Sequence, residues 1–181
     1  MRRTLTAFAA AALFAAPAFA TDWVVDTEAS TVGFEVTAFG SGFTGAFQDF
    51  SAEITLDPEN LDAARIDATV RTGSAELSNA QYASNMQSGA GLDVESHPEA
   101  RFVSEDIRAT DSGYEAVGTL TIKGQSQPLT LPFTLEIDGD RAVADGSFTI
   151  ERAKFGVGGS SWSDVGPRVT VNLHIEADRA G

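Results

Sequence analysis

The chain has 181 residues, of which 26 are acidic and 12 basic, and it contains no cysteine. Without thiols, the protein has no thiolate zinc site, iron–sulfur cluster, c-type haem attachment or cysteine nucleophile. The excess of acidic side chains makes a nucleic acid or an anionic membrane surface a poor partner, because like charges repel.

The first twenty residues have the pattern of an export signal. Two arginines precede a short apolar stretch (residues 4–16), and Ala18-Phe19-Ala20 supplies the small residues of a cleavage site. That stretch is shorter than the about 20 residues that span a bilayer. We therefore expect a signal peptide at 1–20 and one exported domain at 21–181. Loss of the two arginines leaves 10 basic against 26 acidic side chains, a net charge of −16.

Most of the mature chain alternates between apolar and polar residues, which is typical of strands with one buried face. Val32, Phe34 and Val36 begin this pattern, and it returns near the end of the chain at 169–175. Turn residues separate the apolar runs, and Asp138-Gly139-Asp140 is typical of a tight hairpin. We expect strands at about 23–26, 30–38, 43–56, 61–72, 100–109, 113–123, 127–138, 141–151 and 167–178.

Residues 74–90 interrupt the alternation. They contain no Val, Ile or Thr and are rich in helix formers. Leu77, Tyr82 and Met86 lie at spacings of five and four. The segment therefore predicts a short helical insertion near residues 75–88, covering one mouth of a barrel.

The strand count and the one-sided apolar faces favour an all-β fold, an antiparallel barrel of about eight strands. A barrel of this size is either filled by side chains or holds one small ligand. Large phenylalanines share the inward faces with Gly45, Ala68, Gly118 and Gly146. These small residues either leave a lumen open or complement the large ones in a dry core, and the sequence leaves both alternatives open.

The sequence offers little catalytic chemistry. The glycine-rich segment 156–161 matches neither the G-x-S-x-G turn of a hydrolase nor a dinucleotide fingerprint. His97 precedes a proline in a loop, and His174 has the phase of an outward residue, so both are expected to be solvated. We predict no catalytic residue, no metal site and a function other than catalysis.

Three basic residues, Arg152, Lys154 and Arg168, flank the loop that holds Trp162. They are candidate contacts for an anionic or polar ligand head, with the indole as a flat wall. The alternative is ordinary surface pairing with the surrounding acidic residues.

Several segments, in order along the mature chain, resemble the YceI-like family. They include the opening DWVVD, the next strand STVGFEV, the acidic stretch that leads through His97-Pro98 to an aromatic strand, a central hairpin and the run from Phe148 to Gly158. The chain departs from the family at Ala29, where many members have His. It also departs at Asn79–Ser88, where the usual helix is basic and polar and this one is uncharged.

The resemblance implies an extended lipocalin-like barrel in the periplasm. It implies non-covalent binding of a long-chain isoprenoid lipid or a polyprenyl quinone, for transport or sequestration, with no other cofactor. An accessory role beside a cytochrome b561-type membrane protein is the alternative, and a homodimer is a further expectation.

A lumen that holds an isoprenoid tail needs aromatic and aliphatic walls with few polar groups. Each buried methylene contributes roughly 0.8 kcal/mol, so such a tail can bind tightly with little polar recognition. The inward phase of the strands and the helical segment supply the candidate lining residues. These are Phe34, Val36, Phe47, Val70, Tyr82, Met86, Phe102, Leu120, Ile122, Leu131, Phe133, Phe148 and Trp162.

Overall fold

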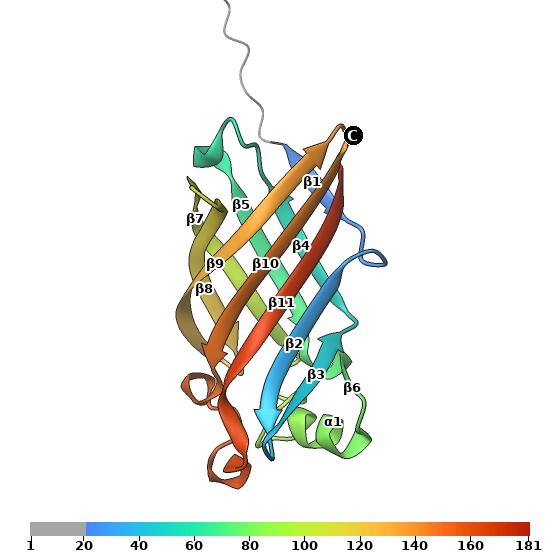
Figure 1. Cartoon of the computed structure of the whole chain (residues 1–181), viewed down its shortest axis with the longest axis vertical. Coiled ribbons are helices and arrows are strands. Elements are labelled where there is room, and N and C mark those ends of the chain that lie inside the picture. Colours follow the sequence, from blue (N-terminus) through green and yellow to red (C-terminus); the bar gives the residue numbers. More distant parts are fainter. Residues whose placement is uncertain (1–20) are drawn as a thin grey trace, which may run out of the picture.

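The computed structural model describes residues 21–181 as an antiparallel β-barrel with one short α-helix (Figure 1). The predicted signal peptide lies outside the described residues. The strands are β1 (Asp22–Val25), β2 (Thr31–Ala38), β3 (Ser41–Phe47), β4 (Phe50–Thr55), β5 (Arg65–Arg71), β6 (Ala75–Leu77), β7 (Glu99–Thr110), β8 (Gly113–Ile122), β9 (Gln125–Asp138), β10 (Arg141–Glu151) and β11 (Val165–Arg179). The helix α1 spans Ala80–Gln87, and the 3-10 turns are η1 (Leu61–Ala63), η2 (Thr72–Ser74), η3 (Arg152–Phe155) and η4 (Ser160–Trp162).

Eight strands form the closed ring, in the order β1, β4, β5, β7, β8, β9, β10 and β11. Each is antiparallel to the next, and β11 pairs back with β1. Alternate residues of a strand face the same side, so closure turns the apolar face of every strand toward one interior. The predicted fold class is confirmed.

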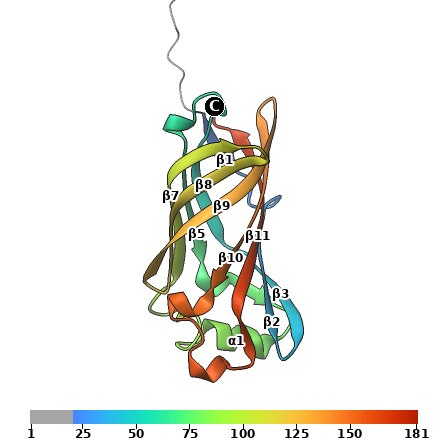
Figure 2. The same ribbon diagram turned by 60° about the vertical axis from the view of Figure 1, so that its left-hand side comes forward.

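The long strand β11 has two neighbours on the same edge. Its last residues pair with β1 through Val25 and Ala177, and its first part pairs with β2 through Val36 and Val169. Between β1 and β2 the chain turns, and the buried Ser30 hydroxyl accepts a hydrogen bond from the backbone N–H of Glu176 at 2.9 Å. Beyond β2, strands β3 and β6 extend the sheet toward the end of the barrel that carries α1 (Figure 2).

The stretch 43–56, expected as one strand, is two strands joined at Gln48 and Asp49. Phe47 and Phe50 both line the interior, although they are three positions apart and would face opposite sides of one regular strand. A single pleated strand cannot place both on one face, so the chain has to turn between them. The predicted strand 61–72 is also shorter, because η1 precedes it and β5 begins at Arg65.

The segment that interrupts the alternation contains β6 and then α1. Asn79 caps the helix, since its side-chain oxygen accepts hydrogen bonds from the N–H groups of Gln81 and Tyr82. The predicted short helical insertion is confirmed. Within residues 21–181, no helix is both long and apolar enough to cross a membrane.

Candidate functional site

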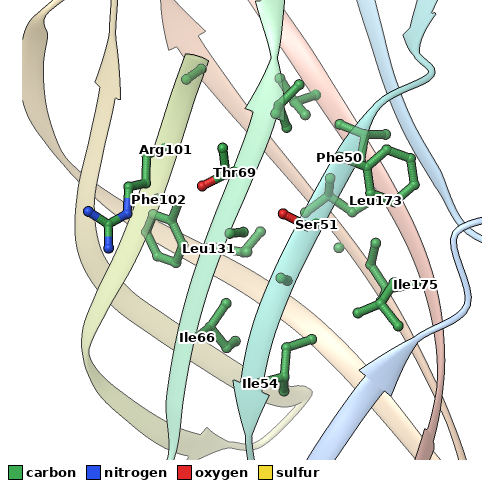
Figure 3. A pocket seen from close by; sticks show the side chains of 18 of the residues that line it. Phe50, Ser51, Ile54, Ile66, Thr69, Arg101, Phe102, Leu131, Leu173 and Ile175 are labelled. Carbon is green, nitrogen blue, oxygen red and sulfur yellow. The ribbon is translucent and has the colours of Figure 1, made fainter. Parts of the chain in front are cut away.

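The barrel encloses a cavity of about 230 Å³. Because one water molecule needs roughly 10–15 Å³ of such room, the interior is hollow and not filled by side chains. Every strand of the ring contributes to the wall. Figure 3 shows apolar side chains from β4, β5, β7, β9 and β11 converging on this space, namely Ile54, Ile66, Phe102, Leu131, Leu173 and Ile175.

The cavity is elongated along the barrel. On β10 the lining runs from Ala142 to Ile150, which corresponds to roughly 26 Å of strand at about 3.3 Å per residue. Strands tilted by about 40° to the axis shorten this to roughly 20 Å along the barrel. The shape therefore suits a chain-like molecule better than a compact one.

One end of the cavity is packed shut. Trp23, Leu56 and Ala177 are buried there, and the Trp23 indole N–H donates a hydrogen bond to the Leu56 carbonyl at 2.9 Å. The Arg179 guanidinium lies 5.0 Å from the centre of the Trp23 ring, on the outside of this plug. A bound tail can therefore extend toward this end without emerging from it.

Polar groups are scarce on the wall. Ser51, Thr69 and Arg101 form one row across β4, β5 and β7. The Arg101 guanidinium donates two hydrogen bonds to Asp67, with Nε at 2.7 Å from Oδ1. These hydrogen bonds hold the pKa of the Asp67 carboxyl below its ordinary value. The charge of Arg101 is thus neutralised on the barrel surface.

The wall has a seam beside β4. β1 pairs with β4 only at Glu53–Thr55, so Phe50–Ala52 have β5 on one side and no strand partner among the described residues on the other. Val32 and Phe47 line the cavity beside this seam. The wall can part here without breaking a strand ladder. The same holds between β9 and β10, whose ladder ends at Phe133 and Gly146, so these two seams are the candidate access routes.

Eight of the thirteen predicted lining residues lie on the cavity wall. They are Phe47, Val70, Phe102, Leu120, Ile122, Leu131, Phe133 and Phe148. Their contact with a ligand stays a prediction.

The other five predicted residues lie away from the cavity wall. The Phe34 ring lies over Gly45, where any Cβ would collide with it, and packs at 5.3 Å between ring centroids from Phe47. Val36 lies further along β2, beyond the ring of eight strands. Tyr82 and Met86 belong to α1, outside the barrel wall. Trp162 follows the loop after η3 and packs near the Arg152 guanidinium.

The predicted head-group contacts are also dispersed. Arg152 is buried and donates hydrogen bonds to the carbonyls of Val157, Trp162, Val165 and Gly166, at 2.8–2.9 Å. With its donors so used, it stabilises the segment that follows η3 and is not available to a ligand.

The two remaining candidates have surface positions. Lys154 forms an exposed ion pair with Glu151 at 3.4 Å. Arg168 is exposed on β11, opposite Glu151 in the ladder. Neither lines the apolar cavity.

Several wall residues were not singled out from the sequence. They include Trp23, Ile54, Ile66, Leu129, Leu135, Leu173 and Ile175. Ile66, Leu129 and Leu135 share the inward phase of a predicted residue on the same strand. Leu173 and Ile175 belong to the alternation at 169–175, so for these five the alternation itself was the signal that would have found them.

The two histidines and the acidic residues do not gather into one cluster in the described part of the chain. No group of three or more His, Asp or Glu residues could hold a metal ion there. His97 and His174 lie apart: the former contacts Gly124 near the β8–β9 turn, and the latter binds Asp145 and Glu176 on the surface of β10 and β11.

The His174 imidazole lies between two carboxylates on the outer surface of β10 and β11. Nδ1 lies 2.7 Å from Asp145 and Nε2 lies 3.2 Å from Glu176. Hydrogen bonds to the Asp145 carboxylate, and then to that of Glu176, raise the pKa of His174 above 6.5. Both nitrogens can donate together only in the imidazolium.

We expect an NMR titration to give His174 a pKa above 6.5 and to find it lowered in Asp145→Asn. Because the folded pKa is raised, the stabilisation is complete below the unfolded pKa and is lost as pH rises through the folded value. His174→Gln should therefore cost more stability at pH 6 than at pH 9, by a modest amount since the side chain is 41% exposed. An unshifted titration would contradict the geometry.

The closed eight-stranded barrel around an apolar lumen places the protein in the class of lipocalin-like barrels, which hold a small ligand inside. The family profile described as YceI-like domain matches residues 23–177. The chain belongs to the YceI-like family, which confirms the resemblance found in its sequence.

Relatives of known sequence are similar over nearly the whole chain. A UPF0312 protein of Pseudomonas aeruginosa is 32% identical and one of Serratia proteamaculans is 27% identical, each over 99% of both chains. Among solved structures, Burkholderia cenocepacia BcnA is 30% identical, with a TM-score of 0.79 over 84% of this chain and 98% of that one.

A polyisoprenoid binding domain from Saccharophagus degradans has a TM-score of 0.68 over 87% of this chain and 98% of that chain. It is 13% identical, so the likeness shows the fold alone.

Proposed function

We propose that this protein is a periplasmic binding protein that carries or sequesters a long-chain isoprenoid lipid or polyprenyl quinone. The observation that carries the proposal is the elongated apolar cavity, lined from every strand of the ring. The fold shared with a polyisoprenoid binding domain supports it. The export signal expected at residues 1–20 supports the compartment. The contact with a membrane cytochrome and the homodimer stay predictions.

The energetics favour such a ligand. With about 0.8 kcal/mol from each buried methylene, a few isoprene units are enough for strong binding. The cavity offers few polar groups to fix a head, so recognition rests on the length and branching of the tail. A saturated straight chain of equal length fills the same space less completely and is expected to bind more weakly.

The test is to express the whole gene, purify the protein from the periplasmic fraction, extract it with organic solvent and analyse the extract by mass spectrometry. We expect one class of isoprenoid, and uptake of an added polyprenyl quinone by delipidated protein. A fatty acid of matched length is the control. A native preparation without lipid that also takes up no quinone would contradict the proposal.

A further inference from the structure

The two ends of the barrel differ in charge. At the end that carries α1 lie three segments, 36–48, 77–92 and 155–163, that contain no Asp, Glu, Lys or Arg (Figures 1 and 2). Both lysines of the chain, Lys123 and Lys154, lie at this end, where they line a shallow pocket with His97.

The opposite end is acidic. The β4–β5 connection contains Asp57, Glu59 and Asp62, and the β9–β10 turn is flanked by Asp138 and Asp140. The last strand also ends there. The molecule is therefore polarised, with most of its repulsion from an anionic surface concentrated far from α1.

An aromatic tip projects at the uncharged end. Phe39 is 62% exposed and occupies, with Gly40, the two-residue turn between β2 and β3. Its ring stacks on Tyr82 of α1 at 6.0 Å between centroids, and Tyr82 meets Phe43 edge-on at 5.2 Å. The turn thus presents a bulky apolar ring to solvent on a supported aromatic base.

The backbone shows that Phe39 is unfavourable for the fold. Its φ is +51° and that of Gly40 is +76°, which is the conformation that Asn-Gly adopts most easily in such hairpins. A phenylalanine in the left-handed region is strained, and only part of its ring is covered here, by Tyr82. Strain of this kind is concentrated at functional sites.

We propose that this end of the barrel docks onto the interfacial region of a lipid bilayer, with Phe39 as the inserting side chain. Aromatic rings are enriched at that depth, where an apolar face meets polar head groups. The acid-free segments reduce the repulsion that a protein of strongly negative net charge meets at a lipid surface. The two lysines offset Asp93 and Asp164, which border these segments. The inference rests on the proposed function, because a lipid carrier has to receive and release its ligand at a membrane.

The site also suits transfer of the ligand. Thr72, Leu92 and Ile122 line the cavity at its α1 end, whereas the Trp23 plug closes the other end. Docking through Phe39 therefore turns the end of the lumen opposite the Trp23 plug toward the bilayer.

The test is co-sedimentation of the lipid-loaded, signal-processed protein with phosphatidylcholine vesicles, for the wild type, Phe39→Asn and Val24→Ser. Val24 is the matched control, since it is 61% exposed but lies on β1, away from α1. Phe39→Asn should lower the partition coefficient by roughly tenfold or more, because a phenyl ring no longer leaves water. Val24→Ser should leave it unchanged.

Folding is controlled in the same samples. Asn suits the turn, while the stacking on Tyr82 is lost, so the Tm of Phe39→Asn should stay within a few degrees of the wild type. Adding phosphatidylglycerol should weaken binding of the wild type, and salt should restore it by screening the repulsion.

The proposal would be overturned by no binding of the wild type, by equal binding of Phe39→Asn, or by an equal loss in Val24→Ser. A loss of self-association instead of vesicle binding in Phe39→Asn would assign the surface to a second copy of the chain and also overturn it. The lipid extracted from each variant separates the two proposals. If the variants retain lipid but the wild type does not bind vesicles, the docking proposal fails and the proposed function stands. If the protein binds vesicles through Phe39 but contains no lipid, the docking proposal stands and the proposed function fails.

Discussion

Ala144→Phe is expected to weaken binding of an isoprenoid tail more than a hundredfold while the barrel stays folded. Ala144 lines the cavity near the middle of β10, beside Leu135 and Ile175 in the ladder. A phenyl ring there occupies space that a tail needs. Displacing about four methylenes removes roughly 3 kcal/mol, which is more than a hundredfold in Kd. Titration of delipidated protein with a fluorescent polyprenyl probe measures it.

The stability of the same variant distinguishes a hollow barrel from a packed one. Enlarging a side chain in a filled core costs about 1–3 kcal/mol, whereas filling a cavity leaves Tm unchanged or raises it. Thr130→Phe, on the exposed face of β9, is the control and should change neither binding nor Tm by much. Normal uptake by Ala144→Phe would mean that the ligand lies elsewhere.

The alternation of apolar and polar residues was enough to predict a barrel, because it has a strict period and the ring uses it on every strand. It did not locate the break between β3 and β4, although the change of parity from Phe47 to Phe50 was visible. The three-residue strand β6 exists only through its pairing with β3. A pairing between distant segments leaves no local pattern in so short a run.

The candidate site was predictable where strand phase alone decides orientation. It was not predictable on β2, where Val32 lines the lumen and Phe34, two residues on, does not. β2 lies outside the ring of eight strands, and Gly45 makes room for the Phe34 ring away from the cavity. The orientation of Arg152 depends on the path of the loop that follows it. No periodicity describes such a path.

Of the four small inward residues, two open the cavity and two do not. Ala68 and Gly146 are on its wall. A Cβ at Gly45 would collide with Phe34, and one at Gly118 would collide with the Val103 carbonyl beside the irregularity in β7. Both alternatives left open by the sequence therefore occur in one barrel, at different positions.

Arg152→Lys is expected to destabilise the protein by about 3–5 kcal/mol, almost as much as Arg152→Ala. The planar guanidinium serves four carbonyls at once, and a single ammonium group cannot reproduce that fork. The neighbouring backbone is built around it, because a Cβ at Gly158, whose φ is +91°, would collide with the guanidinium. Urea unfolding measures the loss.

Lys154→Ala is the control for this prediction, since Lys154 lies two residues away, is exposed and should change stability by less than about 0.5 kcal/mol. Hydrogen exchange should show residues 152–166 losing protection in Arg152→Lys before the strands do. A head-group contact would behave differently, with weaker lipid binding at unchanged stability. That outcome would mean that Arg152 contacts the ligand, and that the segment 157–166 moves when lipid binds.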